Sequence, residues 1–173
     1  MKILLVNPPQ SEVYGGMVSP DYPPLGLSYL GAVLEKANHD VKIIDIDADK
    51  ISNEQFVNIL KEGYELIGFT ATTPTFKRAE EFCRVVKENS NIITVLGGIH
   101  ATIIPEDCIK SKFIDFVIRG EGEATILDLI DAIQNKNKFE EVDGIAFRKN
   151  NEIIYTMWFT DQKKQMCRQP KNK

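Results

Sequence analysis

Cysteine, histidine and extended apolar stretches are scarce in this sequence of 173 residues. The chain has three cysteines and two histidines, and the cysteines, at positions 83, 108 and 167, lie too far apart for a recognisable metal-binding motif. Such an odd, scattered set without an export signal argues against a disulfide framework and predicts a cytoplasmic protein. No apolar stretch approaches the roughly 20 residues that a membrane span needs, so we expect no membrane partner.

Positive charge is scarce over most of the chain. The formal net charge is -4, but residues 157–173 contribute +4, which leaves -8 for residues 1–156. A body this acidic argues against nucleic acid as a partner. We expect the basic tail, residues 157–173, to be disordered or non-native.

Short apolar runs alternate with segments whose apolar residues recur at helical spacing. The runs cover residues 3–6, 41–46, 66–69, 92–96 and 116–118, and the helical segments cover 25–35, 53–62, 76–88 and 124–134. Ser52 and Thr75 stand where helix N-caps are expected. This alternation predicts an α/β domain over residues 1–143, with a five-stranded parallel sheet and helices on both faces. Residues 144–156 predict a β-hairpin with its turn at Lys149, Asn150 and Asn151.

In such a sheet, ligands bind at the carboxyl ends of the strands. The first run is followed by an extended loop that contains Asn7, Pro8, Pro9 and Gly16 and ends at Leu25. Loops of this length in compact domains are functional or disordered. Because Asn-Pro-Pro stands where a phosphate-binding loop would carry glycines, the pattern disfavours a dinucleotide or P-loop site.

Threonines gather after the third run, in T-A-T-T-P-T. One threonine would suffice to cap the next helix. The surplus of Thr70, Thr72 and Thr73 indicates either capping or hydrogen bonds to a polar ligand.

Two adjacent glycines and a histidine follow the fourth run. Gly97 and Gly98 fit either a tight turn or the close approach of a flat or bulky group to the backbone. His100 fits a structural role, a hydrogen bond to a ligand or a metal ligand. The metal role is disfavoured because no further ligands are evident.

The fifth run is followed by R-G-E-G-E, which contains Gly120, Glu121, Gly122 and Glu123. The glutamates suit the start of a helix, but they would repel a bound phosphate. This loop therefore favours amide or hydroxyl contacts.

Taken in order, five motifs resemble the cobalamin-binding domain at the N-terminus of many cobalamin-dependent radical-SAM enzymes. They are L-L-V-N-P-P (4–9), P-P-L-G-L-S-Y-L (23–30), G-F-T-A-T-T-P-T (68–75), V-L-G-G-I-H-A-T (95–102) and V-I-R-G-E-G-E-A-T (117–125). The resemblance implies a flavodoxin-like, Rossmann-like fold with cobalamin across the carboxyl edge of the sheet. It makes the chain a module for a methyltransferase or a related radical enzyme.

The resemblance also assigns roles to residues. Thr70, Thr72 and Thr73 would contact the nucleotide tail of cobalamin, and Gly97 and Gly98 would let its benzimidazole lie against the backbone. His100 would flank the tail. The remaining implied contacts come from the first loop, facing the corrin ring, and from the fifth loop, and they are Asn7, Pro8, Pro9, Gly16, Leu25, Gly120, Glu121 and Gly122.

Two departures from related domains shape the expected function. No histidine occurs between Asn7 and Pro24, where some cobalamin domains carry their cobalt ligand, so we expect a histidine-off and base-off binder with no metal ligand of its own. The cluster motif Cys-x-x-x-Cys-x-x-Cys is absent, so we expect no iron–sulfur cluster and no catalysis by this chain alone. It would need a radical-SAM domain in cis or in trans, and a truncated domain could self-associate.

An alternative is a cofactor-free interaction or substrate-positioning domain of the same fold. Side chains such as Tyr14, Met17 and Tyr22 would then block the carboxyl edge.

Overall fold

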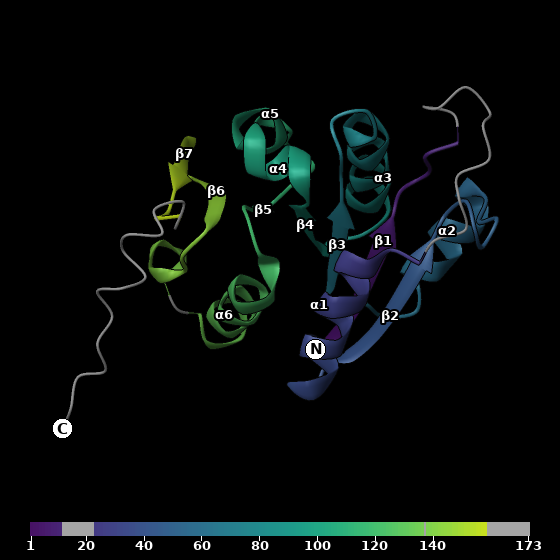
Figure 1. The fold of residues 1–173 in the computed structure, drawn as a ribbon, viewed down its shortest axis with the longest axis horizontal. Helices are drawn as coiled ribbons and strands as arrows, with labels where there is room; N and C mark the ends of the chain where they lie inside the picture. Colours follow the sequence, from purple (N-terminus) through teal and green to yellow (C-terminus); the bar gives the residue numbers. More distant parts are fainter. Residues whose placement is uncertain (12–22, 137, 159–173) are drawn as a thin grey trace.

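A seven-stranded sheet forms the centre of the computed structural model, which describes residues 1–11, 23–136 and 138–158 (Figure 1). The parallel strands lie in the order β2-β1-β3-β4-β5, as a flavodoxin-like fold requires. They are β1 (Lys2–Asn7), β2 (Asp40–Asp45), β3 (Leu66–Thr70), β4 (Ile93–Gly97) and β5 (Phe116–Ile118). The predicted fold class is thus confirmed.

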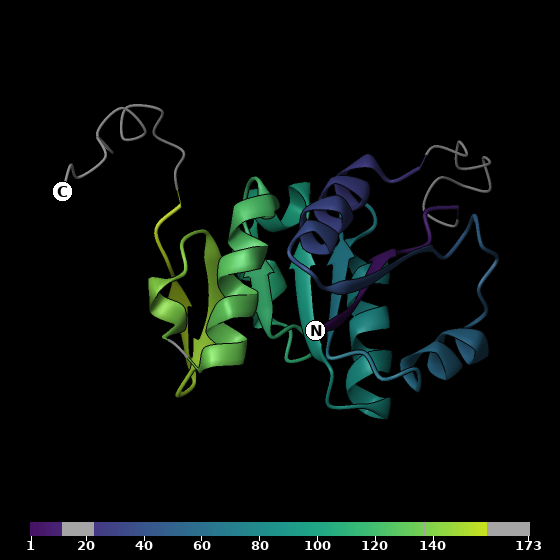
Figure 2. The same ribbon diagram turned by 90° about the horizontal axis from the view of Figure 1, so that it is seen from below.

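Helices cover both faces of the sheet (Figures 1 and 2). On one face, α1 (Leu25–Lys36) and α6 (Gly122–Asn135) pack on inward side chains such as Ile3 and Leu5. On the other face, the core includes Leu4 and Val6 and the helices α2 (Asn53–Leu60), α3 (Phe76–Asn89), α4 (Ile99–Ile103) and α5 (Pro105–Lys110). Successive side chains of a strand point to opposite faces of the sheet, so each central strand contributes to both cores.

Two local expectations had different outcomes. Ser52 caps α2 in a capping box, in which its hydroxyl accepts the Gln55 N–H and the Gln55 side chain accepts the Ser52 N–H. Thr75 stands at the N-cap position of α3 but makes no side-chain cap. Its hydroxyl accepts the N–H of Thr72 instead, at 2.9 Å. Thr75 therefore closes the turn after β3.

The predicted hairpin is part of the sheet. β6 (Ile145–Lys149) pairs antiparallel with β5, and β7 (Glu152–Tyr155) pairs with β6. Asn150 and Asn151 have φ values of 50° and 65°, the left-handed conformation that a tight two-residue turn needs. A short 3-10 helix, η1 (Phe139–Glu141), precedes β6. β6 runs antiparallel to β5, toward the amino edge of the sheet, and β7 runs antiparallel to β6. The end of β7 therefore lies at the carboxyl edge.

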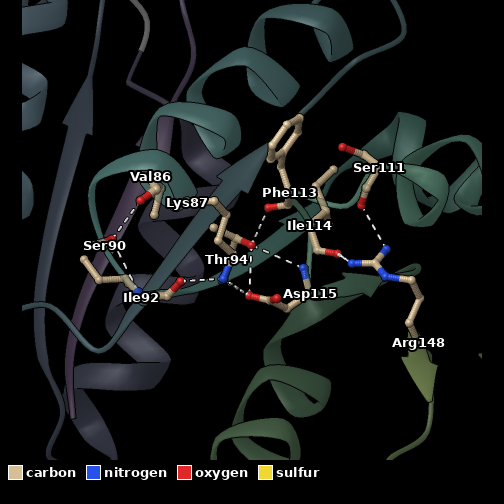
Figure 3. Close-up of polar contacts among 10 residues, drawn as sticks. All are labelled: Val86, Lys87, Ser90, Ile92, Thr94, Ser111, Phe113, Ile114, Asp115 and Arg148. Atoms are coloured by element: carbon tan, nitrogen blue, oxygen red, sulfur yellow. Dashed lines mark hydrogen bonds and ion pairs between the residues drawn. The ribbon is translucent and has the colours of Figure 1, made fainter. Parts of the chain in front are cut away.

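A polar network ties the helices to the sheet at the opposite, amino edge (Figure 3). The carboxylate of Asp115 accepts the N–H of Thr94 at 2.8 Å and pairs with the ammonium of Lys87. The Thr94 hydroxyl donates to the Phe113 carbonyl at 2.7 Å. From β6, the Arg148 guanidinium donates to the backbone carbonyls of Ile109, Ser111 and Ile114. These polar groups satisfy one another.

No helix in the described part of the chain is both long enough and apolar enough to cross a lipid bilayer.

Candidate functional site

Two adjoining cavities open at the carboxyl edge, beside the ends of β1 and β3. In the order β2-β1-β3-β4-β5, the chain reverses its direction of winding between β1 and β3, and open sheets bind ligands at such a switch point. The two cavities share Gly26, Leu27 and Thr70 in their walls. One ligand could therefore occupy both.

The first cavity, here called the glycine slot, is narrow and mostly apolar. It encloses about 160 Å³ on the face of the sheet covered by α1 and α6. Apolar cavities of about 150 Å³ can take up a benzene ring, so the slot suits a flat aromatic group. Its walls include the aliphatic residues Leu27, Leu30, Val95, Ile118 and Ile126, together with the glycines Gly26, Gly68, Gly97, Gly98, Gly120 and Gly122.

The two neighbouring glycines at the end of β4 have different surroundings. A Cβ on Gly97 would meet no atom within 4 Å, so this glycine leaves open space in the slot. Gly98 has a φ of +94°, and its Cβ would lie 2.8 Å from both the Ala71 carbonyl oxygen and Thr70 Oγ1. The backbone at Gly98 is thus approached closely by the chain itself, where β3 ends.

The second cavity is polar and encloses about 290 Å³. The amide of Asn7 donates to the Asp45 carboxylate at 2.6 Å, and the other Asp45 oxygen accepts backbone N–H groups from the turn after β2. The hydroxyls of Thr72 and Thr75 lie 3.1 Å apart. Oxygen and amide groups line this cavity together with Thr70, which suits a ligand rich in hydroxyls or amides.

His100 lies outside both cavities, in the core on the other face of the sheet. Its ring packs against Phe76, with centroids 4.3 Å apart, and its Nδ1 lies 3.2 Å from the hydroxyl of Thr73. The side chain is buried, and Nε2 has no hydrogen-bond partner among the described residues. Burial lowers the pKa of His100, with nearby Asp107 opposing the change and Lys77 adding to it.

The pKa of His100 predicts a loss of stability in acid. The unfolded chain takes up this proton near pH 6.5, whereas folded His100 takes it up only at a lower pH. The free energy of unfolding should therefore fall as the pH drops below about 6.5, and His39, whose pKa is lowered by burial, adds to the same trend. Urea unfolding at about pH 7.5 and about pH 5.5 measures this difference in free energy.

The single variants His100→Gln and His39→Gln separate the two contributions. Each should reduce the difference in the free energy of unfolding between the two pH values. If the free energy of unfolding of His100→Gln still differs between the two pH values as much as that of the parent, His100 is not a source of the pH dependence.

Exposed apolar side chains gather at the carboxyl edge of the sheet. Apart from Ile43 on β2, every large apolar side chain that is exposed in the described ranges belongs to the start of α1, to α4 or to the end of β7 and the residues just after it. These residues are Leu25, Tyr29, Ile99, Ile103, Tyr155 and Met157. All three segments lie at the carboxyl edge, so this edge presents apolar surface to a partner.

Comparison with known proteins identifies the family. A family model described as a B12 binding domain matches residues 12–130, more than half of the chain. The chain belongs to the B12-binding domain family.

Curated relatives of this B12-binding domain are about three times as long as the chain. An uncharacterized methyltransferase of Pyrococcus horikoshii is 36% identical over 156 residues, which cover 88% of this chain and 34% of that protein. An anaerobic magnesium-protoporphyrin IX monomethyl ester cyclase of Synechocystis is 36% identical over 166 residues, which cover 91% of this chain and 32% of that protein. The chain thus spans about a third of the length of these relatives.

Solved structures share the fold of this B12-binding domain. The radical S-adenosylmethionine methyltransferase TsrM from Kitasatospora setae, solved with cobalamin and a [4Fe-4S] cluster, matches with a TM-score of 0.78 at 20% identity, over 92% of this chain and 29% of that chain. The cobalamin-dependent S-adenosylmethionine radical enzyme OxsB, solved with aqua-cobalamin and S-adenosylmethionine, matches with a TM-score of 0.77 at 22% identity, over 92% of this chain and 22% of that chain. Similar domains therefore occur in radical-SAM methyltransferases.

The structure brings most of the predicted contact residues together. The polar cavity contains Asn7, Leu25, Thr70 and Thr72, and the glycine slot contains Thr70, Gly97, Gly98, Gly120, Glu121 and Gly122. Thr73 and His100 pair with each other away from both cavities, and Pro8 and Pro9 line neither of them. Gly16 and the side chains expected to block the edge, Tyr14, Met17 and Tyr22, lie outside the described residues.

Leu25 is the one residue of α1 that the sequence pattern placed in the site, and three further residues of this helix were missed. Gly26, Leu27 and Leu30 line the glycine slot, and Asp45 at the end of β2 lines the polar cavity. The spacing of Leu27 and Leu30 marked a buried helix face. Only the packing of α1 over the end of β1 shows that this face also borders a cavity.

Proposed function

We propose that this B12-binding domain holds cobalamin at its carboxyl edge as a module of a radical-SAM methyltransferase or a related radical enzyme. The observation that carries the proposal is the glycine slot at the switch point of the sheet. Membership of the B12-binding family supports cobalamin as the ligand, and the slot supplies a mostly apolar cavity of about 160 Å³.

The slot fits the nucleotide tail of cobalamin. The tail ends in 5,6-dimethylbenzimidazole, a flat and apolar heterocycle that would lie beside Gly97 between the aliphatic walls. The adjoining polar cavity would receive hydroxyl or amide groups of the same ligand through Thr70, Thr72 and Asn7. Glu121 and Glu123 line the slot, and no Lys, Arg or His among the described residues does, so a negatively charged group such as the phosphate of the tail is disfavoured inside it.

We further propose that cobalt is bound without a histidine ligand. The chain has two histidines. His39 lies at the start of β2, at the amino edge, where its Nδ1 is 3.2 Å from the Met1 nitrogen. His100 is packed against Phe76 in the core. Neither histidine lines the two cavities, so a tail held in the slot would give a base-off, histidine-off state.

Bound cobalamin would supply cobalt-centred group-transfer chemistry, while the residues of this chain bind and orient it. The iron–sulfur cluster and the S-adenosylmethionine site would come from a radical-SAM domain, so this chain would not catalyse the reaction alone.

Titration of the purified protein with hydroxocobalamin, followed by visible absorption, tests the proposal. We expect saturable binding and a base-off spectrum. Cobinamide, which lacks the nucleotide tail, is the matched control ligand, and it should bind at least about tenfold more weakly because the slot stays empty.

A histidine-ligated spectrum would contradict the histidine-off assignment. Equal affinity for the two ligands would contradict the placement of the tail. Absence of any binding would overturn the function and favour a cofactor-free interaction domain.

A further inference from the structure

The chain is held to the sheet for several residues after β7 ends. The Thr156 hydroxyl accepts the N–H of Ile145 at 2.9 Å and lies 3.1 Å from its carbonyl oxygen. The N–H of Gly144 donates to the Met157 carbonyl at 2.7 Å. Residues 156–158, here called the exit segment, are thereby fixed at the carboxyl edge, beside the start of β6.

The last residue of the exit segment packs on a wall of the glycine slot. Gly120 lines the slot and has a φ of +75°, and a Cβ placed on it would overlap the indole of Trp158 at Nε1. The indole thus takes the position that a side chain of residue 120 would have. The N–H of Gly120 donates to the Thr102 hydroxyl at 2.9 Å, so the indole and α4 both hold this glycine.

The neighbouring arginine strengthens this contact. The Arg119 guanidinium lies 5.7 Å from the ring centroids of both Tyr155 and Trp158, within range of a cation–π interaction. It also donates to the Thr156 carbonyl. Its Nε is buried and has no hydrogen-bond partner among the described residues. Arg119 therefore connects the slot wall to the exit segment on both sides of Met157.

We propose that Trp158 is a positioning residue for the cofactor: its indole fixes Gly120 and so shapes the wall of the glycine slot. This inference rests on the proposed function. If the wall is already ordered in the free protein, binding does not have to supply the free energy of ordering it, and the affinity is higher. The link is reciprocal, so a bound nucleotide tail should also hold the indole of Trp158 in place.

The variant Trp158→Ala tests the inference, with Met157→Ala as the matched control. Met157 is the neighbouring residue, its side chain is exposed, and the contact it makes to Gly144 uses its backbone. We expect Trp158→Ala to bind hydroxocobalamin about tenfold more weakly, whereas Met157→Ala stays within about twofold of the parent. Affinity for cobinamide should be the same in all three proteins, because cobinamide does not use the slot.

Equal affinity for hydroxocobalamin in the two variants would overturn the proposal. So would an equal loss for cobinamide, because the effect would then not act through the slot. Trp158→Phe keeps an aromatic ring over Gly120 and should recover part of the affinity.

A second measurement separates this inference from the proposed function. Amide hydrogen exchange at Gly120 in the ligand-free protein should become faster in Trp158→Ala and stay unchanged in Met157→Ala. Unchanged exchange in Trp158→Ala would overturn the role of the indole even if cobalamin binds. If the parent binds no cobalamin, the proposed function fails, and the exchange rate alone decides whether the indole fixes Gly120.

Discussion

Replacing Gly97 with phenylalanine is expected to abolish cobalamin binding while the domain stays folded. Gly97 has no positive φ, and its Cβ would meet no atom within 4 Å, so the backbone accepts a side chain there. A phenyl ring would fill the slot in place of the benzimidazole. We expect affinity for hydroxocobalamin to fall at least about 100-fold, or about 2.7 kcal/mol, measured by visible titration.

Gly97→Ala provides the graded control. One methyl group occupies only part of the slot and should cost much less affinity than phenylalanine. The melting temperature of both variants should stay close to that of the parent. Tight binding by a folded Gly97→Phe variant would show that the tail lies elsewhere.

The adjacent substitution Gly98→Ala is expected to act on stability instead. Its φ of 94° and ψ of -172° belong to a region that is essentially restricted to glycine. The new methyl group would also lie 2.8 Å from the Ala71 carbonyl oxygen and 2.9 Å from the Ala71 nitrogen, both backbone atoms. Strain and overlap together should cost about 3 kcal/mol.

Urea and thermal unfolding measure this cost. A loss of that size corresponds to a fall in melting temperature of roughly 6–12 °C for a domain of this length. Gly97→Ala, one residue away, should change the melting temperature little. A Gly98→Ala variant as stable as Gly97→Ala would show that the backbone at β3 can move aside.

The contrast between these glycines shows what the sequence could and could not predict. The pattern of two glycines after a strand allowed either a tight turn or the close approach of a flat group, and the family resemblance implied a flat ligand at both. At Gly98 the approaching group belongs to Ala71, and this depends on the register of β3 against β4, in which Thr70 lies beside Gly97. Register is a long-range property that local patterns do not carry.

Elements with strong periodicity were predicted well, and short ones were not. The β-strands and α1, α2, α3 and α6 lie close to their predicted positions because apolar spacing marks a buried face. The segment that forms α4 and α5 was treated as a loop, since neither helix is long enough to show a period. This miss affected His100, whose position on α4 turns it into the core against Phe76.

The β6–β7 hairpin has a consequence for how a neighbouring domain would meet the ligand. Two antiparallel passes bring the chain back to the carboxyl edge, and residue 158 lies against a wall of the glycine slot. A domain joined there by a short flexible linker would experience an effective concentration in the millimolar range at the cofactor. Even weak contacts between the two surfaces would then suffice for frequent encounters, and the domains could still separate to admit a substrate.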